Sequence, residues 1–262
     1  MKAVCLHAKD EIEAFLRRNT WLHLYLIGDL DDFFWQYTTW YAAKDALGIK
    51  ELALLYAGTG LPVLLAMPSD SPHLMRELLR SILYLLPRRF YGHLNEEVVT
   101  ALADDYSIQS HGLHYKMALM DSAHLDCVDT PGVIPLSIAD AGEIEALYHV
   151  SYPGNWFDPR MLETGCYYGI RQATELISVA GVHVYSQHYK IAALGNVTTH
   201  PDFRGQGLGT AVCARLCQEL SRTVAHIGLN VKADNVSAIA CYKRLGFECI
   251  ATYEEYTCEL KQ

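Results

Sequence analysis

The feature that most constrains this 262-residue chain is a run of alternating glycines between an apolar stretch and a helical pattern. Residues 197–212 read VTTHPDFRGQGLGTAV, in which Arg204 precedes Gly205, Gly207 and Gly209. The apolar stretch before the run predicts a strand, and leucine or valine at four-residue steps after it predicts a helix. Backbone N–H groups at a helix N-terminus point outward, and the helix dipole adds partial positive charge there. The run therefore predicts an anion site at a strand–turn–helix junction.

Three classes of anionic ligand compete for such a site. The dinucleotide fingerprint GxGxxG/A fails, because its last position is Thr210 when counted from Gly205 and Val212 when counted from Gly207. The nucleoside triphosphate fingerprint needs GK followed by Ser or Thr, and that tripeptide does not occur in the sequence. The third pattern, Q/R-x-x-G-x-G/A, holds the pyrophosphate of coenzyme A. Arg204, Gly207 and Gly209 fit this third pattern.

The second half of the chain predicts a regular order of elements. Residues 141–153 predict a helix with Ile144, Leu147 and Tyr148 on one face. After it we expect two antiparallel strands around a turn at 171–174, a strand at 190–200, a helix at 208–222, a strand at 225–233, a helix at 234–246 and a strand at 247–260. Asp234 or Asn235 is available as N-cap of the last helix, and Gly246 as its stop. The order αβββαβαβ predicts an α/β fold with a mixed sheet and a right-handed βαβ crossover.

The first half of the chain repeats part of this order. Its segments predict a strand at 61–67, a helix at 73–86, a strand at 90–95, a helix at 96–105 and a strand at 106–120. The turn between the first strand and the first helix is PSDSP, residues 68–72, with neither arginine nor glycine. Proline and turn residues at 129–135 mark a boundary between the halves. We interpret the chain as a duplicated fold whose first copy has lost its ligand loop.

Composition argues against several partners. The net charge is −9 and the lysines and arginines form no block, which disfavours nucleic acid. The most apolar stretch, residues 52–67, is shorter than the roughly 18 residues of a membrane span and is broken by two glycines and a proline. It predicts two buried strands joined by a turn, so we expect no membrane partner.

The eight cysteines are scattered, without a CxxC pair, and the first residues show no secretion signal. We therefore expect reduced thiols and a cytoplasmic protein. Cys213 and Cys217 lie one helical turn apart, but no further ligand follows at zinc spacing. The sequence predicts no metal site, and it leaves open whether the chain forms a homodimer.

Residues 134–260 resemble the GNAT superfamily of N-acetyltransferases. Two motifs carry the resemblance in order: residues 197–212, and NVSAIACYKRLGF at 235–247. The resemblance implies the GNAT acyl-CoA N-acyltransferase fold, with a degenerate GNAT-like domain at 1–128 that lacks the coenzyme A loop and a catalytic GNAT domain at 129–262. It implies an enzyme that transfers acetyl from acetyl-CoA directly to the amine of a small molecule or amino acid. The alternative is a non-catalytic sensor or scaffold that binds acyl-CoA.

The resemblance also implies roles for individual residues. Backbone groups of Val197, Thr198 and Thr199 would bond the pantetheine arm and polarise the thioester carbonyl. The loop that would hold the pyrophosphate comprises Arg204, Gly205, Gln206, Gly207, Leu208, Gly209 and Thr210. Asn235 would contact the cofactor. Tyr242 matches the general acid that protonates the departing thiolate, because a phenol with a reference pKa near 10 keeps its proton at neutral pH and can still donate it.

The general base that deprotonates the incoming amine has three candidates, His200, His183 and Glu163, and the sequence does not choose between them. Asn196 stands near the place where many relatives carry an acidic base, and an amide cannot act as one; it would instead orient a water or the acceptor. The missing acid favours the sensor, whereas Tyr242 favours the enzyme.

Acceptor recognition is expected from residues 151–172. The side chains proposed as flat walls are Trp156, Phe157, Tyr167 and Tyr168. Asp158 or Glu163 would meet a cationic acceptor.

Overall fold

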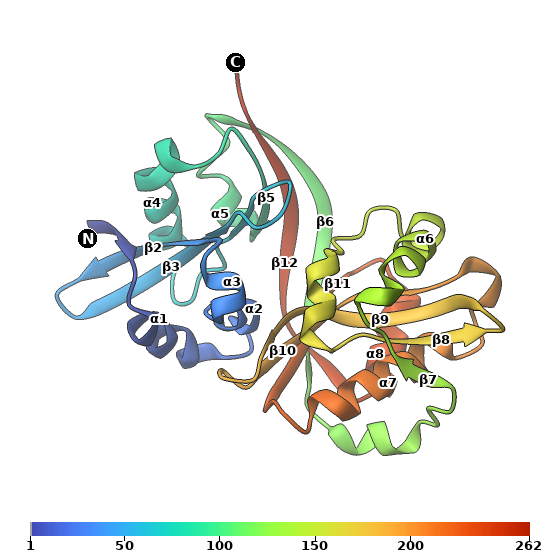
Figure 1. The fold of residues 1–262 in the computed structure, drawn as a ribbon. Helices are drawn as coiled ribbons and strands as arrows, with labels where there is room; N and C mark the ends of the chain where they lie inside the picture. Colours follow the sequence, from blue (N-terminus) through green and yellow to red (C-terminus); the bar gives the residue numbers. More distant parts are fainter. Residues whose placement is uncertain (1) are drawn as a thin grey trace. The chain divides into compact units, whose positions relative to one another are not determined.

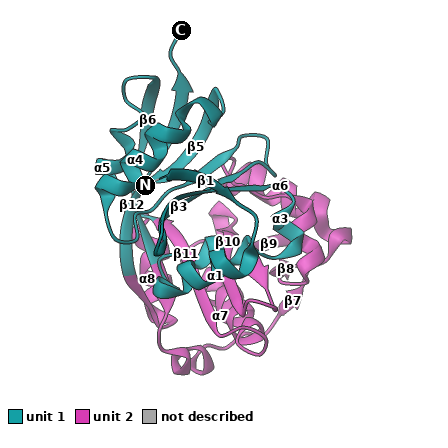
Figure 2. Cartoon of the chain, turned by 90° about the vertical axis from the view of Figure 1, so that its left-hand side faces the viewer, with its two compact units in different colours: residues 1–116, 232–234, 250–262 teal, residues 117–231, 235–249 magenta. Residues whose placement is uncertain are grey.

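The computed structural model describes residues 2–262, which fall into two compact units (Figures 1 and 2). Unit 1 contains the chain up to Lys116 together with Lys232–Asp234 and Ile250–Gln262. Unit 2 contains Met117–Val231 and Asn235–Cys249. These units differ from the predicted ranges 1–128 and 129–262, because the last strand of the chain pairs with a strand of the first half. Turn signals cannot reveal such a long-range pairing.

Unit 1 is built on a mixed sheet with the strand order β1-β2-β3-β4-β5-β12-β6. Its elements are β1 (Lys2–Leu6), α1 (Lys9–Leu16), η1 (Arg17–Asn19), α2 (Leu24–Gly28), α3 (Asp32–Trp35), β2 (Thr38–Asp45), β3 (Gly48–Tyr56), β4 (Val63–Leu65), α4 (Pro72–Ile82), η2 (Leu83–Leu85), β5 (Arg89–Leu94), α5 (Glu96–Val99), β6 (Tyr106–Leu119) and β12 (Phe247–Leu260). The strands β1 to β4 pair antiparallel in sequence, β4 and β5 pair in parallel, and β5 pairs antiparallel with β12. β6 and β12 contribute residues to both units.

Helix α4 begins within one residue of the predicted helix, but it ends at Ile82 and η2 follows, so the predicted end at residue 86 is wrong. Ser71 caps α4 by accepting the N–H of Leu74, and Pro72 occupies the first turn, where its missing donor costs nothing. Its apolar side chains, among them Leu78 and Leu79, join a core with residues of β3, β5 and β12. The predicted helix at 96–105 is wrong beyond Val99, because α5 ends there and a turn follows. The β-branched run from Val98 to Thr100 disfavours a longer helix.

The second half of the chain contains the predicted order αβββαβαβ, and all of it except most of the last strand, β12, lies in unit 2 (Figure 1). Its elements are η3 (Ser122–Cys127), β7 (Val133–Pro135), η4 (Ile138–Asp140), α6 (Ala141–Ser151), η5 (Pro159–Thr164), β8 (Tyr168–Gln172), β9 (Glu175–Ser186), β10 (Ile191–Thr199), η6 (Pro201–Phe203), α7 (Leu208–Leu220), β11 (His226–Lys232) and α8 (Val236–Arg244). The strands lie in the order β11-β10-β9-β8-β7. β7 to β10 pair antiparallel, and α7 connects β10 to the parallel strand β11. The predicted mixed sheet and βαβ crossover are confirmed.

Both faces of the unit 2 sheet are covered. β9 is buried at every residue from Leu176 to Val182, and successive residues of a strand point to opposite faces. Helices α6 and α7 both pack against this strand. The longest helix among residues 2–262 has 13 residues, and none there has the length and apolar character that a membrane-spanning helix needs.

Candidate functional site

Strand β10, which precedes the glycine run, extends beyond the residues that pair with its parallel neighbour β11. The register of β10 and β11 joins residues 191–194 to residues 226–229, although both strands run on for several residues. Val197, Thr198 and Thr199 lie on this extension of β10. Their backbone groups on the β11 side are outside the parallel register and can bond a ligand.

A β-bulge interrupts β10 at the start of this extension. Its antiparallel register with β9 passes from Gly195 opposite Gly181 to Thr198 opposite Val179, so β10 contains one extra residue. Asn196 sits in the bulge with φ +54° and is 4% exposed. The side chain of Asn196 is directed into the unit 2 core. This burial does not support the predicted role of Asn196 in orienting an acceptor.

The glycine run begins as an exposed turn and leads into α7. Gly205 and Gly207 have φ of +77° and +81°, in the left-handed region that favours glycine, and Gly207 is the N-cap of α7. Gly209 has no such backbone demand. A Cβ at Gly209 would meet Thr199 Oγ1 at 3.5 Å, an ordinary contact. Neither backbone conformation nor packing therefore explains the glycine at position 209.

Arg204 ties the turn to the rest of unit 2. Its Nε donates to the carbonyl of Thr199 at 3.2 Å, and its Nη2 donates to the carbonyl of Ser151 at 3.2 Å. The side chain remains exposed. Thr198 and Ser151 are joined by a hydroxyl pair at 3.0 Å. Arg204 thus links the end of α6 to the end of β10 while keeping its charge beside the turn.

Helix α8 carries the two remaining motif residues. Asn235 is its N-cap, as predicted, and accepts the N–H of Ala238 at 3.2 Å. Tyr242 is 7% exposed, with its ring centroid 5.9 Å from that of Phe247. Gly246 ends the helix with φ +91°, and a Cβ there would lie 1.9 Å from the carbonyl oxygen of Asp121. Only glycine fits this helix stop.

The candidate bases are dispersed. The His183 ring packs over Gly195, where a Cβ would lie 1.9 Å from the imidazole. His200 precedes η6 and accepts the N–H of Asp202 through Nδ1, so it shapes the turn. Glu163 is exposed on η5. Of these three, His183 lies beside the bulge residue Gly195.

The four predicted aromatic walls do not form one surface. Phe157 and Tyr167 are in ring contact, with centroids 5.7 Å apart, but Tyr167 is fully buried. Tyr168 follows on the opposite face of β8 and lies near the charges of Glu219 and Arg215 on α7. Trp156 and Asp158 are partly buried in the loop before η5. The expectation of Tyr167 as an acceptor wall is wrong, since no part of its side chain reaches solvent.

Three cysteines, Cys213, Cys217 and Cys241, form a thiol cluster next to the glycine turn, and the sequence did not predict that Cys241 joins the other two. Cys213 and Cys217 on α7 are buried, as expected, and Cys241 on α8 lies near Cys213. Thr210 Oγ1 lies 3.3 Å from Cys241 Sγ. A hydrogen bond from Cys213 lowers the pKa of Cys241 to about 7, against the effect of burial. No group of three or more metal-ligating side chains lies together among residues 2–262.

In unit 1, the turn before α4 is occupied by a carboxylate of the same chain. Glu51 of β3 is fully buried and accepts the backbone N–H of Ser69, Asp70 and Ser71 at 2.9, 3.0 and 2.8 Å. Burial raises the pKa of Glu51, and the three amide bonds offset part of that rise. An acid within the apolar run of β3 is the sequence signal that could have identified this residue.

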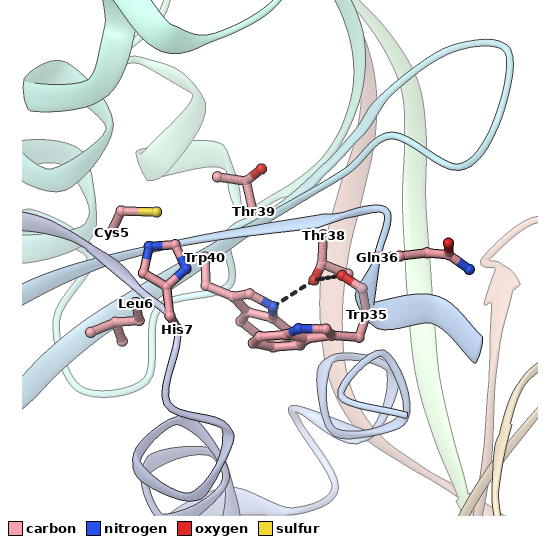
Figure 3. Close-up of a pocket in the computed structure, with 8 residues that line it drawn as sticks. All are labelled: Cys5, Leu6, His7, Trp35, Gln36, Thr38, Thr39 and Trp40. Carbon is pink, nitrogen blue, oxygen red and sulfur yellow. Dashed lines mark hydrogen bonds between the residues drawn. The ribbon is translucent and has the colours of Figure 1, made fainter. Parts of the chain in front are cut away.

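Unit 1 also contains a pocket of about 260 Å³ (Figure 3). It is lined by Cys5, Leu6, His7, Trp35, Gln36, Thr38, Thr39 and Trp40. Trp35 and Trp40 stack within it, and Trp40 Nε1 donates to Thr38 Oγ1 at 2.8 Å. None of the residues predicted to bind the cofactor or to act in catalysis lines this pocket.

Comparison with known proteins agrees with the two motifs. Residues 138–247 match the model of the acetyltransferase (GNAT) family. Over 57 residues the chain is 47% identical to the ribosomal protein bS18-alanine N-acetyltransferase of Escherichia coli strain K12. That match covers 21% of this chain and 38% of the Escherichia coli protein, so the chain spans little more than a third of the length of the curated relatives it matches.

Solved structures resemble the fold over nearly the whole chain. A tandem GNAT protein from the clavulanic acid biosynthesis pathway aligns with a TM-score of 0.57 and 15% identity, covering 100% of this chain and 99% of that protein. A Drosophila protein aligns with a TM-score of 0.65 and 16% identity, covering 96% of this chain and 87% of that protein. The chain therefore has the mixed α/β fold of GNAT acetyltransferase structures, and its residues 138–247 match the GNAT acetyltransferase domain.

Proposed function

We propose that this protein transfers an acetyl group from acetyl-CoA directly to the amine of a small molecule or amino acid. The observation that carries the proposal is the exposed turn at the N-terminus of α7, where Gly205 and Gly207 adopt positive φ next to the extension of β10. Free N–H groups at a helix N-terminus bind phosphate, and the helix dipole favours the negative charge. In this proposal the turn from Arg204 to Thr210 holds the pyrophosphate, and Asn235 contacts the cofactor.

The pantetheine arm would lie along Val197, Thr198 and Thr199. These residues offer backbone groups outside the parallel register, next to the glycine turn. In the reaction, the amine nitrogen forms a bond to the thioester carbonyl carbon, and the carbon–sulfur bond then breaks. The Val197 N–H stabilises the oxyanion of the tetrahedral intermediate. Tyr242 donates its proton to the departing thiolate, and the amine's proton leaves to a base or to water.

We further propose that residues 1–128 descend from a GNAT-like domain that no longer binds coenzyme A, beside a catalytic domain at 129–262. In support, the turn before α4 directs three amides at the carboxylate of Glu51. In this proposal an internal anion takes the place that pyrophosphate would take before α7. The arginine and glycines of the α7 turn have no counterpart in residues 68–72.

Two observations bear on the class of acceptor amine. The net charge of −9 suits a cationic amine. The name of the Escherichia coli relative gives the alanine of a ribosomal protein as its acceptor. A protein N-terminal amine is therefore the acceptor class to screen beside small amines and amino acids.

The first experiment is calorimetric titration with acetyl-CoA of the wild type, Arg204→Glu and Arg222→Glu. Arg222 follows α7, about 20 Å along the helix from the glycine turn, so its reversal changes the net charge equally without altering the turn. We expect micromolar binding to the wild type and to Arg222→Glu, and loss of binding by Arg204→Glu. A folded wild type that does not bind acetyl-CoA would contradict the proposal.

A non-catalytic sensor of acyl-CoA is the second candidate. It is favoured by Asn196, an amide that cannot act as a base and is buried in the core. Both candidates predict acetyl-CoA binding, so turnover separates them. Acetylation of any amine in the screen, detected by mass spectrometry, decides for the enzyme. A covalent acetyl-protein intermediate in the same experiment would contradict direct transfer.

A further inference from the structure

We propose that Tyr148 and Tyr167 are positioning residues that hold the bulge of β10 so that the Val197 N–H is aimed at the thioester oxygen. This inference rests on the proposed function, because it concerns the same site. Neither tyrosine belongs to the two motifs of the family. Both lie under the bulge, in the core of unit 2, and both hydrogen-bond to Asn196.

The bulge has a conformation that requires support. Asn196 is one of three non-glycine residues with positive φ among residues 2–262, and it is the only buried one of the three. Asparagine tolerates the left-handed region better than most residues, but this backbone conformation still costs folding free energy. Asn196 and Val197 lie between the paired positions Gly195 and Thr198, so the ladder with β9 alone does not define their orientation.

Tyr148 holds the backbone of the bulge. Its hydroxyl donates to the carbonyl oxygen of Asn196 at 2.6 Å, and its ring packs against Phe157 with centroids 5.2 Å apart. Burial raises the pKa of Tyr148 well above its usual value, so the hydroxyl keeps its proton and remains a donor. The peptide between Asn196 and Val197 is planar and trans, so its C=O and N–H point in opposite directions. Holding the carbonyl toward Tyr148 therefore directs the Val197 N–H away from Tyr148.

Tyr167 holds the side chain of the same residue. Asn196 Nδ2 donates to the Tyr167 hydroxyl at 3.2 Å, and that hydroxyl donates to the carbonyl of Val182 at 3.3 Å. The Tyr167 ring lies against Gly181, where a Cβ would be 2.1 Å from the ring. A carboxylate at position 196 has no N–H to donate to Tyr167. This arrangement gives a physical reason for asparagine at position 196, because the side chain supports the bulge.

The consequence is a preorganised oxyanion donor. A donor contributes most when it is already aimed at the position where negative charge develops, so that no reorganisation is needed during the reaction. Without the Tyr148 hydroxyl, the strained bulge can relax and the Val197 N–H can turn. The effect falls on the polarisation of the thioester, whereas the pyrophosphate turn and the affinity it supplies stay intact.

The test uses acetyl-CoA labelled with ¹³C at the thioester carbonyl. Infrared difference spectra of this ligand are recorded on the wild type, Tyr148→Phe, Tyr167→Phe and Tyr185→Phe. Tyr185→Phe is the matched control, because it removes a hydroxyl of the same unit that bonds Thr223 Oγ1 at 3.2 Å. Calorimetry with unlabelled acetyl-CoA gives the affinity of each variant, and circular dichroism reports its folding.

We expect the carbonyl band of the bound ligand to move to lower frequency in the wild type and in Tyr185→Phe. In Tyr148→Phe the shift becomes smaller while Kd changes less than about threefold, and Tyr167→Phe changes in the same direction by less. With an accepted amine, kcat of Tyr148→Phe falls at least about tenfold, part of the roughly 10²–10³ lost when an oxyanion donor is removed.

The outcomes separate this inference from the proposed function. A wild type that binds no acetyl-CoA contradicts both. A wild type that binds and polarises the thioester, with a folded Tyr148→Phe that does so equally, overturns only the positioning role. If Tyr148→Phe does not fold, an unchanged band shift in Tyr167→Phe overturns the inference on its own.

Discussion

Tyr242 is placed on α8 within the motif that resembles the family's second motif, and it is 7% exposed. A phenol near the departing sulfur can supply the proton that a thiolate needs.

We predict that Tyr242→Phe lowers kcat by roughly 10²–10⁴ and leaves KM for acetyl-CoA nearly unchanged, because general acid catalysis acts in the transition state. The measurement is steady-state kinetics with an amine from the screen. Tyr185→Phe is again the control, since it removes a phenol outside the proposed site. A kcat that does not change in Tyr242→Phe would show that another group protonates the thiolate.

His23 supplies a second prediction at the residue scale, through the pH dependence of stability. Burial, and then the charges of Lys116 and Arg18, lower the pKa of His23 from 6.5 to about 4, and Asp70 opposes this. A histidine with a lowered pKa in the folded state stabilises the fold above pH 6.5, and this stability is lost as the pH falls toward 4. Between pH 7 and pH 5 the contribution amounts to about 2 kcal/mol.

The measurement is urea unfolding at pH 7 and pH 5, followed by tryptophan fluorescence. Three of the four tryptophans, Trp21, Trp35 and Trp40, belong to unit 1 with His23, so the signal reports mainly on that unit. His23→Asn, which keeps a partner for Ser69, should lose less stability than the wild type over this pH range. Equal losses in the two proteins would exclude His23 as the titrating group.

At the scale of elements, the junction of β10 and α7 contains two glycines whose backbone requirements differ. Gly207 needs its positive φ, whereas Gly209 lies in the first turn of α7 without that need. Stability and binding should therefore respond differently to the same substitution.

We predict that Gly209→Ala stabilises the protein by about 0.5–1 kcal/mol, because alanine is the better helix former, and weakens acetyl-CoA binding, because its methyl group meets the ligand. Gly207→Ala should destabilise by about 1 kcal/mol or more through backbone strain. Thermal unfolding and calorimetry give both quantities for both variants. Unchanged binding by Gly209→Ala would mean that no ligand approaches the N-terminus of α7.

At the scale of the whole molecule, the question is how many cofactors one chain binds. The amides before α4 are already bonded to Glu51, whereas the turn before α7 is exposed. We predict one acetyl-CoA per chain by calorimetry, and a stoichiometry of two would refute the proposal that unit 1 has lost its cofactor site.

We also predict that Glu51→Ala destabilises the protein by about 3 kcal/mol or more, because three backbone N–H groups of one turn lose their shared acceptor. Urea unfolding measures this loss. Glu77→Ala is the control, because Glu77 is half exposed on α4 and pairs with His73 at the surface. Similar small effects of the two substitutions would show that Glu51 is not needed to hold the turn.

The sequence alone determined the elements of the second half and the two motifs. Local patterns suffice for this, because helix periodicity, capping by Asn235 and the glycine stop at Gly246 are set by neighbouring residues. The same patterns predicted α4 and the strands from β3 to β6, although they extended α4 and α5 too far. They assigned nothing to the first 50 residues, where helices are short and strands carry mixed side chains.

Tertiary structure decided the rest, because the deciding contacts join residues far apart in the chain. The pairing of β12 with β5 moved residues 250–262 into unit 1. Glu51 meets its amide partners 18 to 20 positions away, and Tyr148 meets Asn196 48 positions away. An acid in a strand or a tyrosine on a helix face has no local signature of its partner. The sequence thus predicts where a cofactor would bind, and the packing of distant residues decided how the backbone at that place is held.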